Sequence, residues 1–294
     1  MTANPTPAGR RPPPPHPVSG RRWRIASTLA LAASLVLNAL ANTLPLNDRT
    51  TGELSALYPN LFVPAGVTFS IWSAIYLALM AWAVAQFVPS RRARPPTWGR
   101  LTGPRPPAGR RALGEFIGPH FALACVLNGL WIVAWHWEQV ALSVVVMLAL
   151  LATLVLLNVR LVGSRFLLPR LAFGLYLGWI VVATVANVTA LLVALGWSGE
   201  VPGLRWLMPG MAPPAVVWAA GLAALGALIL RETILRLEAS WVGAAGTWAL
   251  SGIVLARYAD HPVIAGVAAL GALLVLVTAI RTGLANLRRA RNPA

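Results

Sequence analysis

The amino-acid sequence predicts an all-α fold, a polytopic membrane helical bundle with eight transmembrane helices. Of the 294 residues, 57% are hydrophobic and only 11% are charged, and the mean hydropathy is +0.69. This composition excludes an ordinary soluble domain. Apolar stretches long enough to cross a bilayer alternate with loops rich in Arg and Pro. We place the spans at about 25–44, 66–88, 118–137, 140–159, 170–195, 213–231, 239–257 and 262–282.

The distribution of arginine supports this count and orients the chain. All 24 basic residues are Arg. With eight crossings, 21 of them fall on the side of the N-terminus, and the other side receives Arg49, Arg205 and Arg257. Cytoplasmic loops carry an excess of basic residues, so both termini are expected in the cytoplasm. Abundant Ala, Arg and Pro without Lys are typical of a GC-rich bacterial gene, so we expect a multi-pass protein of the bacterial inner (cytoplasmic) membrane.

The chain divides into four parts by composition. We expect a disordered basic tail at 1–22, a five-helix transmembrane core at 23–197, three additional transmembrane helices at 198–284 and a basic C-terminal tail at 285–294. Pro, Gly and Arg dominate the first tail and prevent a packed core. The first span also resembles a cleaved signal peptide. Its length, and the asparagines within it, favour a retained helix.

Two loops of the core differ in character. Residues 89–117 contain seven arginines and six prolines without periodicity, which predicts a flexible loop. Residues 45–63 carry Leu57, Tyr58, Leu61 and Phe62. Because these side chains are apolar, we expect this loop to fold back onto the bundle.

An aromatic stripe marks the second span. Phe69, Trp72, Tyr76 and Met80 follow one another at spacings of three, four and four, so they share one face of a helix. A bilayer favours aromatic residues mainly at its two edges. Such a stripe usually packs against another helix. The alternative is that it forms one wall of a site for a flat ligand.

Similar faces recur on three other spans, where indoles, phenols and amides line up at helical spacing. Polar amides are costly in hydrocarbon unless paired, so these faces should point into the bundle. Together with the stripe they provide our candidate ligand-binding residues, namely Asn38, Asn42, Phe69, Trp72, Tyr76, Asn128, Trp131, Trp135, Tyr176, Trp179 and Asn187.

Several kinds of chemistry have no support in the sequence. No predicted span holds a charged residue away from its ends, which argues against an ion-coupled transporter. The sequence has no Gly-rich phosphate loop, no metal-spaced His or Cys cluster and no paired carboxylates placed for acid–base work. Cys125 is the single cysteine, so an intrachain disulfide is impossible. We therefore name no catalytic and no metal-binding residues.

The motifs of the first five spans resemble the TspO/MBR family of tryptophan-rich sensory and translocator proteins, in a longer bacterial branch. They are the asparagines of the first span, Pro64-Ala-Gly66, Trp72-x-x-x-Tyr76-x-x-x-Met80, Leu127-Asn128-x-x-Trp131 and Tyr176-Leu-x-Trp179 followed by Asn187. The resemblance covers about residues 25–197. The family's Trp-containing Lys-Pro stretch before the second helix is missing, and the last three spans lie outside the resemblance.

This resemblance implies a five-helix bundle with a pocket at one end, roofed by the first loop. It also implies a porphyrin or haem as ligand; some members bind sterols or synthetic drugs. The expected function is that of an integral membrane binding or sensory protein, or facilitator, for a flat hydrophobic ligand such as a tetrapyrrole. The alternatives are a structural or assembly protein whose Trp and Asn faces only pack helices, and a porphyrin-degrading enzyme.

The expected partners are the lipid bilayer with its anionic headgroups and a small hydrophobic ligand. Nucleic acid is not expected in spite of the net charge of +16, because the arginines flank apolar spans. The sequence does not decide whether the protein forms a homodimer.

Overall fold

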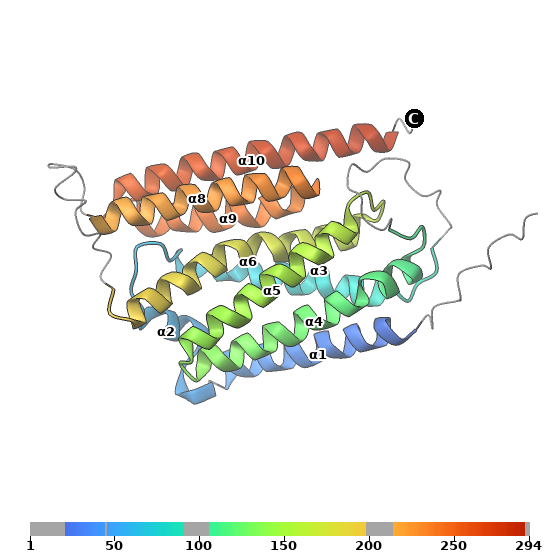
Figure 1. The fold of residues 1–294 in the computed structure, drawn as a ribbon, viewed down its shortest axis with the longest axis horizontal. Coiled ribbons are helices and arrows are strands. Elements are labelled where there is room, and N and C mark those ends of the chain that lie inside the picture. The colour runs from blue at the N-terminus through green and yellow to red at the C-terminus, as the bar shows by residue number, and fades with distance from the viewer. Residues whose placement is uncertain (1–20, 45, 91–105, 198–213, 292–294) are drawn as a thin grey trace, which may run out of the picture.

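The computed structural model describes residues 21–44, 46–90, 106–197 and 214–291, which form helices and loops and no strand (Figure 1). The α-helices of these ranges are α1 (Arg22–Thr43), α2 (Thr51–Ala56), α3 (Ile71–Ala85), α4 (Arg110–His136), α5 (Val140–Leu161), α6 (Leu167–Ala194), α8 (Pro214–Leu237), α9 (Ser240–Arg257) and α10 (Pro262–Arg291). Two short 3₁₀ helices, η1 (Leu46–Asp48) and η2 (Gly66–Ser70), precede α2 and α3.

Each predicted span coincides with a helix, and the all-helical membrane fold is confirmed. In the described ranges, 7 helices are long and apolar enough to cross a bilayer. The remaining predicted span, 239–257, is α9, which has 18 residues and does not reach that standard. Its Gly, Ser, Thr, Trp and terminal Arg residues lower its mean hydropathy, and its small residues suit it to close contact with other helices.

Five helices form a closed ring. α1 packs against α4 and α3, α4 against α5, α5 against α6, and α6 against α3. Large buried side chains fill the ring, among them Trp82 of α3. Phe121 of α4 meets Phe173 of α6 edge to face, with ring centroids 5.0 Å apart. This is the five-helix core predicted from the sequence.

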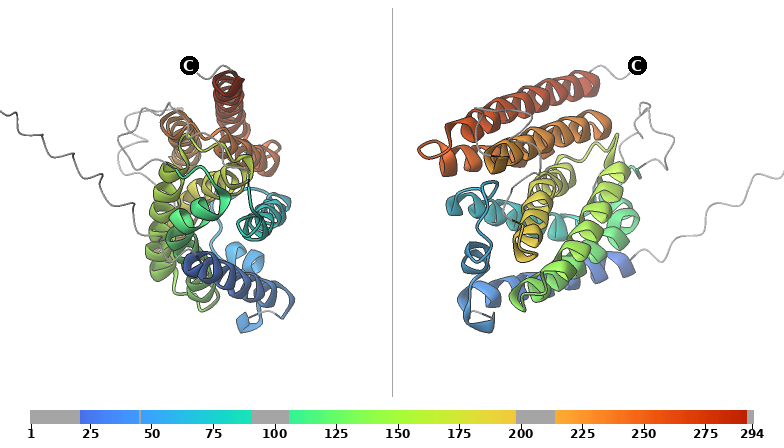
Figure 2. Two further views of the ribbon diagram at one scale, coloured as in Figure 1. Left: turned by 90° about the vertical axis from the view of Figure 1, so that its right-hand side faces the viewer. Right: turned by 60° about the vertical axis from the view of Figure 1, so that its left-hand side comes forward.

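The three C-terminal helices form a second layer beside this ring (Figure 2). α9 and α10 lie side by side, α8 contacts both, and α9 packs along α6. Gly174 and Gly178 of α6 allow the close approach, because Trp241 and Val242 of α9 occupy the space a β-carbon would need. Small residues at four-residue spacing permit such contact between membrane helices.

Replacing Gly178 with alanine should therefore lower the thermal stability of the purified protein. The new β-carbon would collide with the backbone carbonyl oxygen of Val242 and lie 3.0 Å from its carbonyl carbon. Overpacking of this kind destabilises by roughly 1–3 kcal/mol. Gly266→Ala is the matched control, because nothing lies within 4 Å of a β-carbon at that position of α10. Equal melting temperatures of the two variants in detergent would contradict the prediction.

The two largest boundary errors are the start of α4 and the end of α10. α4 begins at Arg110 rather than near 118, so the end of the expected flexible loop 89–117 is helical, while residues 91–105 lie outside the described part. α10 continues to Arg291, so most of the predicted tail 285–294 is helix. Asn286 and Arg289 of this helix bond Glu238 at the α8–α9 turn, at 2.9 and 2.8 Å. The predicted N-terminal tail falls almost wholly outside the described residues.

The longer α4 brings an acidic residue into the bundle. The Oε1 atom of Glu115 lies 3.1 Å from the Nε atom of Arg24 in α1, and both side chains are buried. Arg24 also donates to the carbonyl oxygen of Gln86 at 3.3 Å. The sequence placed Glu115 in a loop, but it lies in the second turn of α4, near the start of that helix.

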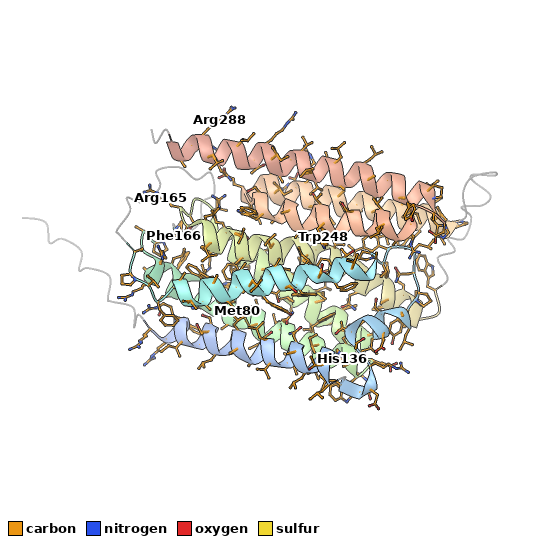
Figure 3. All side chains as sticks on the ribbon, turned by 180° about the vertical axis from the view of Figure 1, so that it is seen from behind. Met80, His136, Arg165, Phe166, Trp248 and Arg288 are labelled. Carbon is orange, nitrogen blue, oxygen red and sulfur yellow. The ribbon has the colours of Figure 1, made fainter. Side chains whose placement is uncertain are left out.

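The two ends of the bundle differ in character. α1 begins and α10 ends at the same end, and α2 lies at the other (Figure 1). Figure 3 shows Arg165 and Arg288 at the first end and His136 near the second. The arginine-rich segments of the described chain therefore share one end, as the predicted alternation of loops requires.

Candidate functional site

The loop between α1 and α3 folds over one end of the five-helix ring, as predicted. It contains α2, whose start is fixed by a capping box: Thr50 Oγ1 accepts from the Glu53 amide at 3.3 Å, and the Glu53 carboxylate accepts from the Thr50 amide at 2.7 Å. The hydrogen bonds that the Thr50 amide and hydroxyl donate to the Glu53 carboxylate hold the pKa of this carboxyl below its usual value. The residues 46–63 therefore form an ordered roof.

Side chains of α4 attach this roof to the bundle. The indole nitrogen of Trp135 donates to the Thr51 carbonyl oxygen at 3.4 Å, and its ring lies 5.8 Å from that of Tyr58. Asn47 donates to the carbonyl oxygen of His136 at 3.0 Å. Leu54 is buried beneath α2 beside Trp135. The indole of Trp135 thus joins the roof to α4.

The chain between the roof and α3 is held by α9. The Ala65 amide donates to the Gly252 carbonyl oxygen at 3.0 Å, and the indole of Trp248 donates to the Thr68 carbonyl oxygen at 2.8 Å (Figure 3). Gly252 is required here because Thr68 packs into the space of its missing side chain. α9, which lies outside the five-helix ring, therefore helps to hold the segment that joins the roof to α3.

A cavity of about 810 Å³ lies between the roof and the ring. Aromatic side chains form much of its wall, and amide and hydroxyl groups are spread among them. Of the predicted residues it contains Asn38, Phe69, Trp72, Tyr76 and Trp131. A narrower space of about 70 Å³ shares Phe69, Trp72 and Trp131 with it and adds the predicted residues Trp135, Trp179 and Asn187.

Two further predicted residues, Asn128 and Tyr176, do not line either space. Asn128 is only 1% exposed and lies behind the wall, where its side-chain oxygen accepts from Asn38 at 2.8 Å and from Ser34 at 3.0 Å. Tyr176 is buried and meets Trp72 edge to face at 5.7 Å. The side chain of Asn42 lies outside the described part of the chain. Asn128 and Tyr176 can thus support the wall but do not form it.

Trp72 stands at the centre of the aromatic wall. Its ring stacks on Tyr76 at 5.1 Å and meets Trp179 edge to face at 6.2 Å. Met80, the fourth residue of the predicted stripe, is 39% exposed and points away from the core. The stripe therefore fits both interpretations, helix packing and a wall for a ligand. Its first three residues line the cavity, and Trp72 also packs against neighbouring helices.

Two hydrogen-bond networks fix the orientation of the wall. The Tyr76 hydroxyl donates to the side-chain oxygen of Asn38 at 2.7 Å. The indole nitrogen of Trp131 donates to the side-chain oxygen of Asn187 at 3.0 Å, and the amide of Asn187 donates to Ser143 at 2.9 Å. Because buried polar groups need partners, this pairing meets the requirement for the side chains of Asn38 and Asn187.

Several lining residues escaped the sequence prediction. Thr51, Ser55, Tyr58 and Asn60 come from the roof, where only the apolar side chains gave a signal of contact with the bundle. Arg257 comes from the end of α9. The sequence singles out Arg257 in one respect. It is one of the three arginines predicted to lie on the side of the membrane with few arginines.

The side chains that line the larger cavity define the chemistry open to this site. Among the described residues no group of three His, Cys, Asp or Glu side chains could hold a metal ion. The described lining of the larger cavity provides aromatic faces, amides, hydroxyls and one guanidinium. A second cavity, of about 370 Å³, lies between the roof and α8 and shares Asn60 and Arg257 with the first.

The comparisons with known proteins agree with this arrangement. The sequence profile of the family described as TSPO-like protein matches residues 24–281. The match extends past the five-helix core through α8 and α9 and into α10, so these helices are part of the family pattern and not outside it. No curated protein and no solved structure shows significant similarity to the chain. The predicted relationship is thus confirmed, and the chain belongs to the TSPO-like protein family, as a membrane protein of the TspO type.

Proposed function

We propose that this protein binds a flat hydrophobic ligand, a tetrapyrrole such as a porphyrin or haem, and acts as a membrane binding or sensory protein or as a facilitator for that ligand. The observation that carries the proposal is the cavity of about 810 Å³ with aromatic walls. Pockets for small ligands and cofactors usually measure roughly 300–1,000 Å³ and combine apolar walls with a few polar groups.

The wall suits a planar ring system. Trp72 and Trp131 both line the cavity, and indoles favour stacked or edge-to-face contact with other aromatic rings. Asn38 and Tyr76, which are joined by a hydrogen bond, add an amide and a hydroxyl to the lining of the same cavity. Ring stacking would supply affinity, and the polar groups would fix the orientation of the ligand.

A structural role is the second candidate. Trp72, Tyr76 and Trp179 contact one another at distances normal for aromatic packing, which a protein without a ligand would also need. An enzyme receives less support, because the described cavity lining carries no carboxylate and no histidine for acid–base work.

Titration with protoporphyrin tests the proposal. The full-length protein in detergent should quench its tryptophan fluorescence on addition of protoporphyrin, and the porphyrin absorption band should shift at the same ligand concentrations. Pigments that copurify with the protein should be identified by absorbance and mass spectrometry. Absence of saturable quenching and of any copurified tetrapyrrole would leave the structural role as the better account.

We also propose that the roof lies outside the bacterial inner membrane and that both termini are cytoplasmic. In a Cys125→Ser background, a cysteine replacing the exposed Asp48 should react with an impermeant maleimide in intact cells. A cysteine replacing the exposed Arg288, which lies at the opposite end (Figure 3), should react only after permeabilisation. Reversed labelling would contradict this orientation, because it would place the arginine-rich end outside.

A further inference from the structure

The cavity wall contains a charge that the five-helix core does not supply. Arg257, the last residue of α9, is the charged member of the described cavity lining. The rest of that lining consists of apolar, aromatic, amide and hydroxyl side chains. A flat apolar ligand does not require a guanidinium, so the presence of Arg257 calls for an explanation beyond stacking.

Neutral groups hold most of this guanidinium in place. Its Nε atom donates to the Leu61 carbonyl oxygen at 3.0 Å, and Nη2 donates to the Asn60 carbonyl oxygen at 2.9 Å. Carbonyl oxygens position the side chain but leave its positive charge uncompensated. An arginine has five N–H donors, so these two bonds do not exhaust it.

The nearest carboxylate is a weak counter-ion. Asp260 Oδ2 lies 3.5 Å from Nη1, beyond the usual length of a charge-assisted hydrogen bond. The side chain of Asp260 is 53% exposed, against 19% for Arg257. Water therefore screens the pair, and an anion inside the cavity could compete with Asp260 for the guanidinium.

We propose that Arg257 makes the cavity selective for a flat ligand that carries an anionic group, a carboxylate at its edge, and that Arg257 binds this group while the ring stacks on the aromatic wall. This inference rests on the proposed binding function and specifies its ligand class. Arginine suits the role because its planar fork matches the two oxygens of a carboxylate. The C-terminal layer then supplies the anchoring group for a cavity built mainly by the core.

The test compares two ligands with the same ring. Protoporphyrin carries two carboxylates, and its dimethyl ester carries none. Affinities of both should be measured for the full-length protein and for the Arg257→Gln variant, in nanodiscs of zwitterionic phosphatidylcholine. The substitution should weaken binding of the acid by at least about tenfold, since a hydrogen bond to a charged group contributes that much or more. Binding of the ester should change little.

Arg49→Gln is the matched control. Arg49 is exposed, lies in the roof and pairs with Glu138 at 3.5 Å, and it is absent from the cavity lining. Its removal lowers the net charge at the same end of the bundle by the same amount. Binding of the acid should therefore be nearly unaffected in this variant.

Other outcomes would overturn the inference. Equal losses for acid and ester in Arg257→Gln would show that Arg257 only positions the roof through Asn60 and Leu61. Equal losses in the Arg257→Gln and Arg49→Gln variants would indicate general electrostatic attraction. If adding anionic lipid abolishes the preference of the unsubstituted protein for the acid, a lipid phosphate occupies Arg257 instead. Failure of both ligands to bind the unsubstituted protein would contradict the proposed function itself. This outcome differs from a failure of the Arg257 inference, in which both ligands still bind.

Discussion

Replacing Glu115 with alanine is expected to lower the free energy of unfolding by about 3–5 kcal/mol, as is typical when one partner of a buried ion pair is removed. The Arg24 and Glu115 side chains are 9% and 7% exposed. In the variant, Arg24 keeps its bond to the Gln86 carbonyl and its position over the Phe87 ring, at 5.4 Å. It loses the carboxylate of Glu115, so one partner of the buried ion pair is removed.

Two comparisons separate this effect from a general loss of charge. Glu138 pairs with Arg49 at 3.5 Å, and both side chains are 44% exposed, so Glu138→Ala should change stability by at most about 1 kcal/mol. The double variant Arg24→Met with Glu115→Leu removes both charges and keeps most of the volume. It should recover most of the lost stability, because an apolar pair can replace a buried ion pair. Thermal unfolding in detergent measures all three, and similar melting temperatures for the Glu115 and Glu138 variants would refute the assignment.

The same ion pair explains the error at the start of α4 in reading the fold from the sequence. Apolar periodicity located each membrane helix, because a bilayer selects strongly for long apolar segments. It failed at the start of α4, where Arg110, Arg111 and Glu115 reduce the apolar signal. The polarity of these residues suggested a loop. The sequence does not show that Glu115 pairs with Arg24, which lies 91 positions away in the chain.

The lining of the candidate cavity could also be predicted in part from the sequence. Helical spacing identified which faces of α1, α3, α4 and α6 turn inward, and eight of the eleven candidates line the cavity or the adjoining space. Spacing does not reveal how far a residue lies from the axis of the site. Asn128 and Tyr176 share the inward faces but are covered by neighbours. Arg257 escaped because its contacts with the roof join residues 196 and 197 positions apart.

Replacing Trp72 with alanine is expected to raise the dissociation constant for protoporphyrin by at least about tenfold. Trp72 is shared by the larger cavity and the narrow space beside it, so its ring faces the volume that the ligand would occupy. An aromatic contact contributes about 0.5–1.5 kcal/mol beyond the area it buries. Loss of that contact together with the buried area exceeds the 1.4 kcal/mol that corresponds to one decade of affinity.

The neighbours of Trp72 make the choice of controls important. Because Trp72 packs on Tyr76 and Trp179, the alanine variant also loses packing. Trp72→Phe keeps an aromatic face and most of the volume, so it should bind with an affinity between those of the unsubstituted protein and Trp72→Ala. Trp137→Ala removes an indole that is 52% exposed and lies outside the cavity lining, and it should leave binding unchanged.

Affinity and stability measured on the same variants decide between the two roles of the aromatic wall. Porphyrin absorbance should be used to follow binding, because removing a tryptophan alters the protein fluorescence. A wall for a ligand requires that Trp72→Ala weaken binding at temperatures where the variant is fully folded. A lower melting temperature with unchanged porphyrin affinity would instead assign Trp72 to helix packing alone. The cavity would then lose its central stacking surface, and the structural role of the protein would become the better interpretation.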